Sequence, residues 1–566
     1  MRACWFTLLI LGTVLAGCGT ESPPPPAATT EELPLPPGAE SAAEEITEEG
    51  LRAHVTAVAS DEMEGRGPGS DGDRRARRYL AEQMESLGLE PAFAGGAWEQ
   101  PVILVGVASN PPNSWEFRGP DGAVAAFRHD EEFVASAGRQ RDATIEEAPV
   151  VFVGYGIDAP EQGWDDFKGA DLEGKVVLVL NDDPDWDEEL FAGERKLRYG
   201  RWDYKYESAA AQGAAAAIIL HTTESAGYPW AVVQTGARGE EFELPAGDEP
   251  RLDVRAWITE PAARELVALS GHDLDELIAS ARSGDFAPVE LGLTTSLAID
   301  ADVRTTESAN VAGILRGGDL ADEVVIYSAH HDHFGIGAPD ETGDRIYNGA
   351  LDNGVAMAQA LATAKAFAAL PNPPRRSVMF LFVAAEEQGL LGSHYFATSD
   401  AIHAGKAAAN INFEMGNVWG RTRDVTVYGR GKSELEDLLR VAAARQDRVL
   451  TSEPDVRAGW FYRSDQFSFA RVGIPAIWFK SGTEFIGRPE GWGEERYAEW
   501  IRDRYHRPSD EVEPDWVYDG LAEDARLAFL VGAAVATRDE MPRWRPGDEF
   551  EAVRERALAE VAATTS

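Results

Sequence analysis

Long apolar runs that do not alternate with polar residues constrain the fold of this chain most, and they lie in its second half. After residue 308 such runs alternate with helical segments, of which the Ala-rich segment 355–370 is the clearest. A strand that is apolar on both faces must be covered on both, which favours a mainly parallel sheet between two layers of helices. We therefore expect an α/β fold with a mixed, mainly parallel sheet and helices on both faces. The predicted strands are 324–329, 377–384, 407–413 and 475–479.

Ionisable side chains follow three of these predicted strands directly. The first strand runs into the sequence HHDH at 330–333, the second into Glu386-Glu387, and the third into Glu414. In sheets of this kind the chemistry gathers at the carboxyl ends of the strands. We expect these side chains to meet in one site.

Two further segments extend this set. The loop 348–354 (NGALDNG) opens the Ala-rich helix and carries Asp352, and His506 lies far downstream. Both cysteines, Cys4 and Cys18, lie at the N-terminus, so the body offers oxygen and imidazole ligands without thiolate. That donor set favours Zn²⁺, with Mn²⁺ or Co²⁺ as substitutes. Two histidines, two terminal carboxylates and one shared carboxylate could bind two ions about 3.5–4 Å apart, leaving one carboxylate as a base.

Each of these elements also has an ordinary structural explanation. A histidine after a buried strand is commonly packed in the core, a Glu-Glu pair commonly faces solvent, and the loop at 348–354 can be a capped turn. Their order along the chain and their shared position at strand ends favour the metal site over three unrelated explanations.

With these motifs, the chain resembles the co-catalytic zinc aminopeptidase family, which includes bacterial leucyl aminopeptidases and glutamate carboxypeptidase II. The resemblance covers roughly 48–110 and 300–540, and it includes a Ser-Asp…Gly-Ile-Pro-Ala stretch at 464–476. The implied ligands are His330, Asp352 and Glu414 for one zinc ion, and Asp352, Glu387 and His506 for the other.

The resemblance also implies roles for residues beside the ligands. Glu386 would be the general base, Asp332 would orient His330, and Tyr505 would donate to the oxyanion that forms during the reaction. The peptide bond after Asp352 is often cis in relatives. His331 and His333 match no ligand position and are expected to pack or to support the ligands.

One departure from the family pattern concerns Glu414. Many members carry Asp in the stretch that reads Asn412-Phe413-Glu414-Met415 here. Glutamate can ligate through its longer side chain, so the change leaves the geometry and metal preference of that ion open.

The expected activity is that of an exopeptidase that releases N-terminal amino acids, through a water that bridges the metals and is activated by Glu386. Glu484 is the candidate to receive the substrate ammonium. A carboxypeptidase would instead need a cation, and Arg463 or Lys480 could supply it. That alternative stays open, as do a glutaminyl-cyclase-like acyltransferase and a non-catalytic binding lipoprotein.

The segment 140–290 predicts an inserted unit. Its stretches VVFVGYGI, GKVVLVL and AAAQGAAAAIIL resemble the β-rich protease-associated domain that is often inserted in this family. Residues 46–139 and 291–566 would then form the two parts of the catalytic unit.

The N-terminus predicts export. Residues 1–18 have a short apolar run after Arg2, the size of a signal-peptide core rather than of a membrane span. The run ends in Leu15-Ala16-Gly17-Cys18, which resembles the lipobox of bacterial lipoproteins, so we expect Cys18 to be lipidated. A plain secretory signal is the alternative. The Pro- and Glu-rich residues 19–45 should form a disordered tether to the cell envelope, and Gly19 favours the outer membrane.

The charge of the chain bears on its partners. It has 52 basic and 97 acidic residues, which gives a net charge of −45. Nucleic acid requires basic residues to neutralise its phosphates, so this composition argues against it as a partner. Peptides are the expected partners, the lipid is the expected contact with a membrane, and the oligomeric state stays open.

Overall fold

The computed structural model describes residues 32–187 and 190–565. The chain divides into two units, Met1–Glu32 and Leu33–Ser566, and the description below concerns the second of them. The predicted signal peptide and Cys18 lie outside the described residues. Among the described helices, none is long and apolar enough to cross a membrane.

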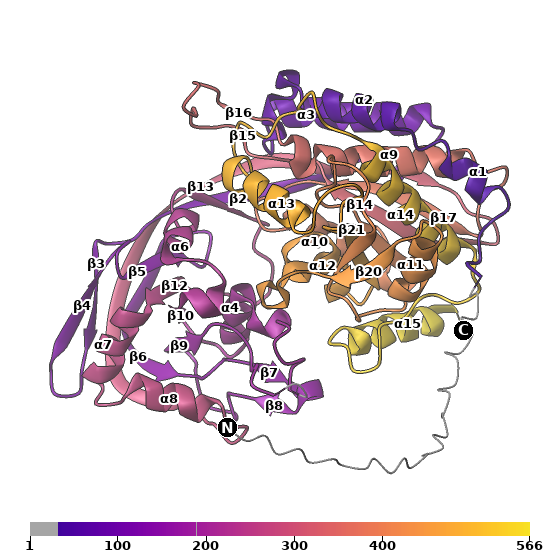
Figure 1. The fold of residues 1–566 in the computed structure, drawn as a ribbon. Helices are drawn as coiled ribbons and strands as arrows, with labels where there is room; N and C mark the ends of the chain where they lie inside the picture. Colours follow the sequence, from indigo (N-terminus) through magenta and orange to yellow (C-terminus); the bar gives the residue numbers. More distant parts are fainter. Residues whose placement is uncertain (1–31, 188–189, 566) are drawn as a thin grey trace, which may run out of the picture. The chain divides into compact units, whose positions relative to one another are not determined.

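The main sheet is mixed, as the apolar runs predicted (Figure 1). Its strand order is β20–β19–β21–β18–β14–β17–β13–β2–β11. The four central strands β21, β18, β14 and β17 run parallel, whereas β13 and β19 are antiparallel to their neighbours β17 and β21. The bounds are β2 (Glu99–Asn110), β11 (Glu240–Glu243), β13 (Val289–Leu315), β14 (Leu320–His330), β17 (Arg376–Val383), β18 (Ala407–Asn412), β19 (Asp424–Tyr428), β20 (Val449–Ser452) and β21 (Ala476–Ser481).

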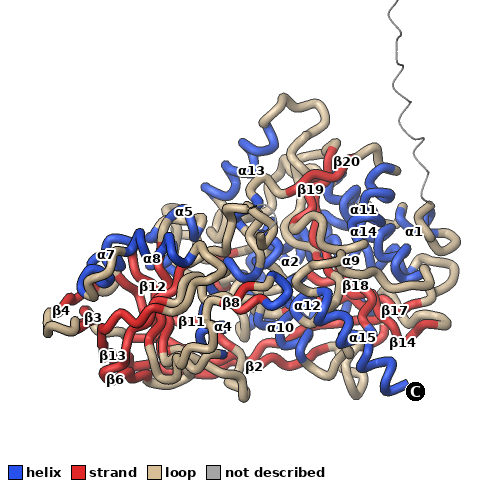
Figure 2. Tube along the Cα trace, turned by 90° about the horizontal axis from the view of Figure 1, so that it is seen from below, coloured by secondary structure: helices blue, strands red, loops and turns tan. Residues whose placement is uncertain are grey.

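Helices cover both faces of this sheet because its strands are apolar on both. Along β14, Val325 and Tyr327 belong to one buried cluster, and Val324 and Ile326 belong to another. The first cluster includes α2 (Glu48–Val58), α9 (Val355–Ala368), α11 (Leu435–Ala444) and α14 (Asp519–Thr537). The second includes α10 (Leu391–Thr398) and α12 (Gln466–Arg471). Figure 2 shows these helices in blue around the red strands, and the predicted fold class is confirmed.

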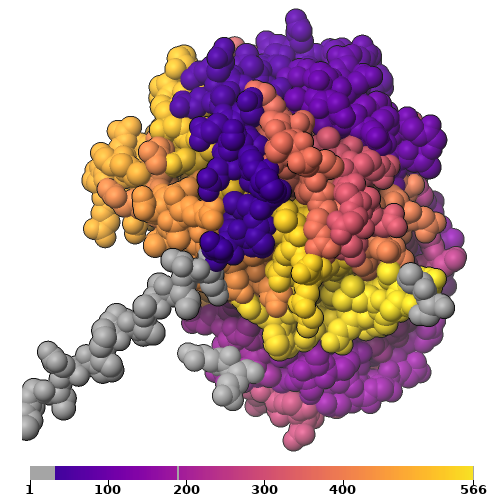
Figure 3. Space-filling view, turned by 90° about the vertical axis from the view of Figure 1, so that its right-hand side faces the viewer, coloured from indigo at the N-terminus to yellow at the C-terminus, as the bar shows by residue number. Residues whose placement is uncertain are grey.

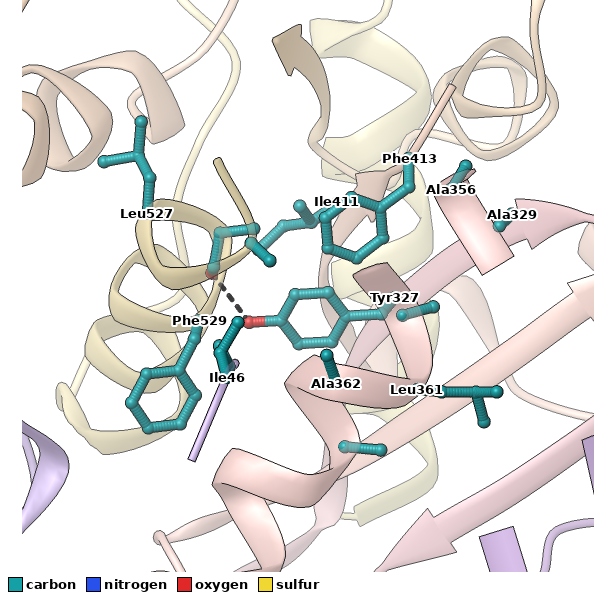
Figure 4. Packing of buried hydrophobic residues seen from close by; sticks show 14 of the residues in the cluster. Ile46, Tyr327, Ala329, Ala356, Leu361, Ala362, Ile411, Phe413, Leu527 and Phe529 are labelled. Carbon is teal, nitrogen blue, oxygen red and sulfur yellow. Dashed lines mark hydrogen bonds between the residues drawn. The ribbon is translucent and has the colours of Figure 1, made fainter. Parts of the chain in front are cut away.

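Tyr327 joins the central strand β14 to helix α14 (Figure 4). Its ring stacks on Phe380 and Phe413, with ring centres 5.1 and 5.9 Å apart. Its hydroxyl donates a hydrogen bond of 2.8 Å to the carbonyl oxygen of Ala528. Gly532 lies one helical turn further on, and a Cβ there would come within 1.8 Å of that hydroxyl. This contact fixes α14 against the strand that ends at the candidate site.

A second sheet has its own buried cluster, which draws on residues between Val105 and Ile299, a wider range than 140–290. Its strand order is β4–β3–β13–β6–β9–β10–β12–β5, and β6 to β12 run parallel. The long strand β13 belongs to both sheets, because its first half pairs with β6 and its second half with β2 and β17. The bounds of the other elements are β3 (Ser114–Arg118), β4 (Val124–Arg128), β5 (Phe133–Ala137), β6 (Ala143–Phe152), β9 (Val176–Leu180), β10 (Ala216–His221), β12 (Val254–Thr259), α4 (Trp202–Ala211), α6 (Trp230–Gly236), α7 (Glu260–Leu269) and α8 (Leu274–Ala281).

The end of the predicted tether is ordered, which corrects the expectation of disorder up to residue 45. Leu33, Ala39 and Ala42 are buried, and α1 (Ala39–Ala43) is in contact with α14. Arg526 of α14 donates to the carbonyl oxygen of Ala43. In Figure 3 this indigo segment lies along the yellow C-terminal residues. The apolar residues of this stretch pack against α14, and the composition of the segment alone does not predict this contact.

Candidate metal centre

Four of the six candidate residues lie at the carboxyl ends of three neighbouring strands. His330 is the last residue of β14, Glu386 and Glu387 follow β17, and Glu414 follows β18. Asp352 lies in the turn Ala350–Gly354 that opens α9. His506 comes from the loop after α13 (Trp492–Asp503). The predicted meeting of these six side chains is therefore found in the structure.

His330 faces three carboxylates through its Nε2 atom. The nitrogen lies 3.3 Å from Oδ1 of Asp352, 3.5 Å from Oε2 of Glu414 and 3.9 Å from Oε2 of Glu386. The His330 side chain is 1% exposed.

His506 faces the other side of Asp352. Its Nε2 lies 3.3 Å from Oδ2 of Asp352 and 3.2 Å from Oε2 of Glu387. Asp352 thus presents one oxygen to each histidine. Glu387 lies beside His506, whereas both Glu414 and Glu386 lie beside His330. The resemblance implies Glu414 as the ligand beside His330 and assigns Glu386 to the base.

The spacing of these atoms fits zinc. Tetrahedral zinc binds nitrogen and oxygen at about 2.0–2.2 Å, which separates neighbouring ligand atoms by about 3.3–3.6 Å. The buried Nε2 of His506 has no hydrogen-bond partner among the described residues. There are two groups of three side chains, within each of which the potential ligand atoms all lie within 4.8 Å of one another. They are His330, Asp352 and Glu387, and His330, Glu386 and Glu414.

The electrostatics of the cluster also favour a cation. Burial, together with Glu414 and Glu387, raises the pKa of Glu386 well above its usual range. Burial lowers the pKa of His506, but Glu387 and Asp352 outweigh it and raise the value to about 10. Four carboxylates packed beside two imidazoles carry an excess of negative charge that a divalent ion would neutralise.

Asp332 supports the site in a way that differs from the implied role. Its carboxylate accepts hydrogen bonds from the backbone N–H groups of Glu386, at 3.0 Å, and Glu387, at 3.3 Å. The Nδ1 atom of His330 lies 3.8 Å from this carboxylate and 3.2 Å from the backbone carbonyl oxygen of Asp332. The carboxylate therefore fixes the Glu386-Glu387 turn, and the backbone carbonyl lies closest to the imidazole.

Further side chains hold the ligands without belonging to the predicted set. His333 Nδ1 lies 2.6 Å from Oε1 of Glu387, and Ser464 donates a 2.8 Å hydrogen bond to Oε2 of Glu414. Asp510 accepts from the backbone N–H of Asp352 at 3.1 Å. Ser464 stands in the motif stretch at 464–476, so its place was visible in the sequence although its role was not.

Arg66 is a supporting residue for which the sequence carries no signal. It is fully buried, and its guanidinium donates to four backbone carbonyl oxygens. These belong to Val58, His331, Asn348 and Gly349. A single side chain thus ties the loop that carries Asp352 to the end of β14.

The other predictions for this region concern the peptide bond after Asp352, the position of His331 and the surroundings of Tyr505. The peptide bond between Asp352 and Asn353 is cis, as the resemblance implies. His331 points away from the cluster, with Nε2 3.0 Å from the carbonyl oxygen of Ala309. Tyr505 stacks on the ring of His506, with centres 3.7 Å apart. Burial, together with Asp352 and Glu387, raises the pKa of Tyr505.

The three predicted substrate-binding residues lie outside the ligand cluster. Arg463 packs over Trp460, at 5.0 Å from the ring centre, and its Nε has no hydrogen-bond partner among the described residues. Glu484 is exposed. Lys480 lines a cavity behind Glu414.

A sheet of this kind, with imidazoles and carboxylates beside its strand ends, could hold metal ions. Residues 310–529 match the family model described as Peptidase family M28, and all six clustered residues fall inside the match. This part of the chain is therefore similar to peptidase family M28.

Individual proteins resemble the chain more distantly. It is 28% identical over 205 residues to a probable leucine aminopeptidase 2 of Aspergillus fumigatus. The aligned part covers 35% of this chain and 38% of that protein, so the chain spans less than half the length of this curated relative. An aminopeptidase from Aneurinibacillus sp. strain AM-1 has a TM-score of 0.46 at 22% identity, over 88% of this chain and 95% of that one. A peptidase M28 precursor from Shewanella amazonensis has a TM-score of 0.37 at 18% identity, over 90% and 97%.

Proposed function

We propose that this chain is an exported di-zinc exopeptidase that releases N-terminal amino acids from peptides. The observation that carries the proposal is the position of Asp352 between two histidines, with Glu414 and Glu386 beside His330 and Glu387 beside His506. One ion would be held by His330, Asp352 and Glu414, and the other by Asp352, Glu387 and His506. Bound there, the ions would polarise the peptide carbonyl and lower the pKa of a water molecule.

Glu386 is the proposed general base. Its side chain is 12% exposed and lies 3.9 Å from His330 Nε2, so it borders the cluster without being enclosed by it. Its carboxylate would take the proton of the attacking water and return it to the leaving amine. The hydrogen bonds from the Glu386 and Glu387 amides to Asp332 hold the backbone that positions it.

Tyr505 is the proposed donor to the oxyanion. Its ring is fixed by stacking on His506 and by Trp500, with a centre distance of 5.5 Å. Its raised pKa keeps the hydroxyl protonated, which a hydrogen-bond donor requires.

A free amine on the substrate is favoured by the charge of the chain. A net charge of −45 attracts ammonium groups and repels carboxylates at a distance. A carboxypeptidase is the second candidate, because Arg463 and Lys480 form no ion pair with a carboxylate of the described residues.

The experiment is turnover of aminoacyl-arylamides and of N-blocked peptides, with the zinc content determined on the same sample. Two zinc ions per chain and cleavage of free-amine substrates alone would support the aminopeptidase. Cleavage of blocked peptides with a free carboxylate would support the second candidate. Protein that binds no zinc would contradict both.

Export and lipidation at Cys18 belong to the same proposal and are supported by the lipobox-like sequence. Mass spectrometry of protein from the membrane fraction of a bacterial host should find an acylated N-terminal Cys18. A Cys18→Ser variant should lose the lipid and leave the membrane fraction. An unmodified N-terminus at another residue would contradict the lipid anchor.

A further inference from the structure

An aromatic cavity behind Glu414 contains a lysine that the proposed reaction does not use. The cavity has a volume of about 240 Å³, which suits one side chain or terminal group of a peptide. Trp478, Tyr428 and Tyr497 line it, and the amine of Lys480 lies 4.5–5.9 Å from their ring centres.

The walls of the cavity are bonded to the segment that carries Glu414. The indole N–H of Trp478 donates to the carbonyl oxygen of Glu414 at 3.1 Å. The hydroxyl of Tyr497 donates to the sulfur of Met415 at 3.7 Å, and Gly416 lines the cavity. A group bound in the cavity is therefore next to a proposed metal ligand.

Lys480 has capacity for a further hydrogen bond. Its residue is 8% exposed, and its ammonium donates to the hydroxyl oxygen of Tyr497 at 3.1 Å. Burial lowers its pKa, but Tyr428 and Tyr497 outweigh burial and raise it, so the amine is charged at neutral pH. An ammonium has three donors, and the hydrogen bond to Tyr497 accounts for one of them.

No aspartate or glutamate among the described residues forms an ion pair with Lys480. The comparison with Lys432 makes this notable, because that residue is also 8% exposed and its amine lies 3.2 Å from Asp548 and 2.7 Å from Glu549. Asp455 borders the cavity, but it is exposed and its carboxylate accepts from the backbone N–H of Arg457. A buried charge without an opposite charge is costly, so an anion that enters the cavity would be stabilised.

We propose that this cavity binds a carboxylate of the substrate through Lys480. The inference rests on the proposed function and adds a substrate class to it. Two groups of a peptide have this chemistry: the side chain of an N-terminal Asp or Glu, and the C-terminal carboxylate. The aromatic walls exclude water, which strengthens the ion pair with either group.

The test compares substrates that differ by one charge. The first pair is the arylamides of glutamate and glutamine, and the second is an N-acetyl dipeptide with a free or an amidated C-terminus. We expect the wild-type protein to favour the charged member of one pair by about 10- to 100-fold in kcat/KM. Lys480→Met should bring that ratio close to one, and Lys480→Arg should retain part of it. The pair that responds identifies the source of the carboxylate.

The control is Lys365→Met, which removes an equal charge from a half-exposed lysine that pairs with Glu45 at 3.1 Å. It should leave both ratios as in the wild type. Equal ratios in wild type and Lys480→Met, or no preference within either pair, would overturn the proposal.

Binding of glutarate and of its neutral diamide to the unmodified protein, measured by calorimetry, decides the matter if Lys480→Met fails to fold. Tighter binding of glutarate supports the proposal, and equal binding of the two overturns it. Because this measurement needs no turnover, it separates the two hypotheses. A protein that cleaves nothing would contradict the proposed function, whereas the carboxylate site would still stand or fall on glutarate.

Discussion

At the scale of single residues, the proposal gives Glu386 the role of general base and the other five clustered side chains the role of metal ligands. Glu386→Gln keeps the size of the side chain and removes the base. We expect both metal ions to remain and kcat to fall by about 10²–10⁴-fold, as for loss of a general base. Arylamide turnover and zinc content measured together check this. Glu490→Gln, at an exposed position, is the control and should be fully active. A near-normal rate in Glu386→Gln would remove this residue from the role.

Asp352 and His506 should differ in how many ions their loss releases. Asp352 faces both histidines, so Asp352→Ala should lose both ions, whereas His506→Gln should lose one. Elemental analysis after dialysis gives zinc per chain for each variant. Equal zinc content in the two variants would contradict the sharing of Asp352.

His54, which lies outside the candidate metal site, should make the free energy of unfolding depend on pH. Burial, with a contribution from Lys365, lowers its pKa from 6.5 to about 4. The unfolded chain therefore takes up this proton at a higher pH than the folded one. As the pH falls from 6.5 to 4, this group should reduce the free energy of unfolding, by about 3 kcal/mol at most. Urea unfolding of wild type and His54→Gln across this range measures the effect. Parallel curves for the two proteins would refute it.

At the scale of elements, the contact between α14 and β14 has no room for another atom. Gly532→Ala would place a Cβ 1.8 Å from the hydroxyl of Tyr327, so a fully buried ring or helix must move. We expect a loss of about 1–3 kcal/mol in the free energy of unfolding. Gly236→Ala is the matched control, since nothing lies within 4 Å of a Cβ there. Equal stability of the two variants would show that the helix adapts without cost.

At the scale of the whole molecule, metal binding should couple to folding. The proposed ligands come from segments between residues 330 and 506, which only the folded chain brings together. A ligand that binds only the folded state stabilises it by mass action. Chelation should therefore lower the melting temperature, and added zinc should restore it. Asp352→Ala should melt at the same temperature with and without chelator; a chelator effect of wild-type size in this variant would point to a second metal site.

The expectations held where local sequence carries the physical cause. Short apolar runs without alternation favour central strands, and β14, β17, β18 and β21 agree with the predicted ranges to within a few residues. The clustering of His330, Glu386, Glu387 and Glu414 was accessible because each of these residues ends or follows a predicted strand. The ordered structure of residues 33–45 could not be predicted, because their burial depends on a surface of α14 that is nearly 500 residues away in sequence.

The sequence by itself determined the α/β class and the four side chains that meet at the strand ends, because both follow from patterns within a few residues. Only the tertiary structure decided what supports and surrounds them. Arg66 donates to carbonyl oxygens of four separate positions, and the carboxylate of Asp332 binds amides 54 and 55 residues away. Lys480 has aromatic neighbours and no acidic partner among the described residues. Such contacts join distant segments, and their energies depend on burial and partners that exist only once the chain has folded.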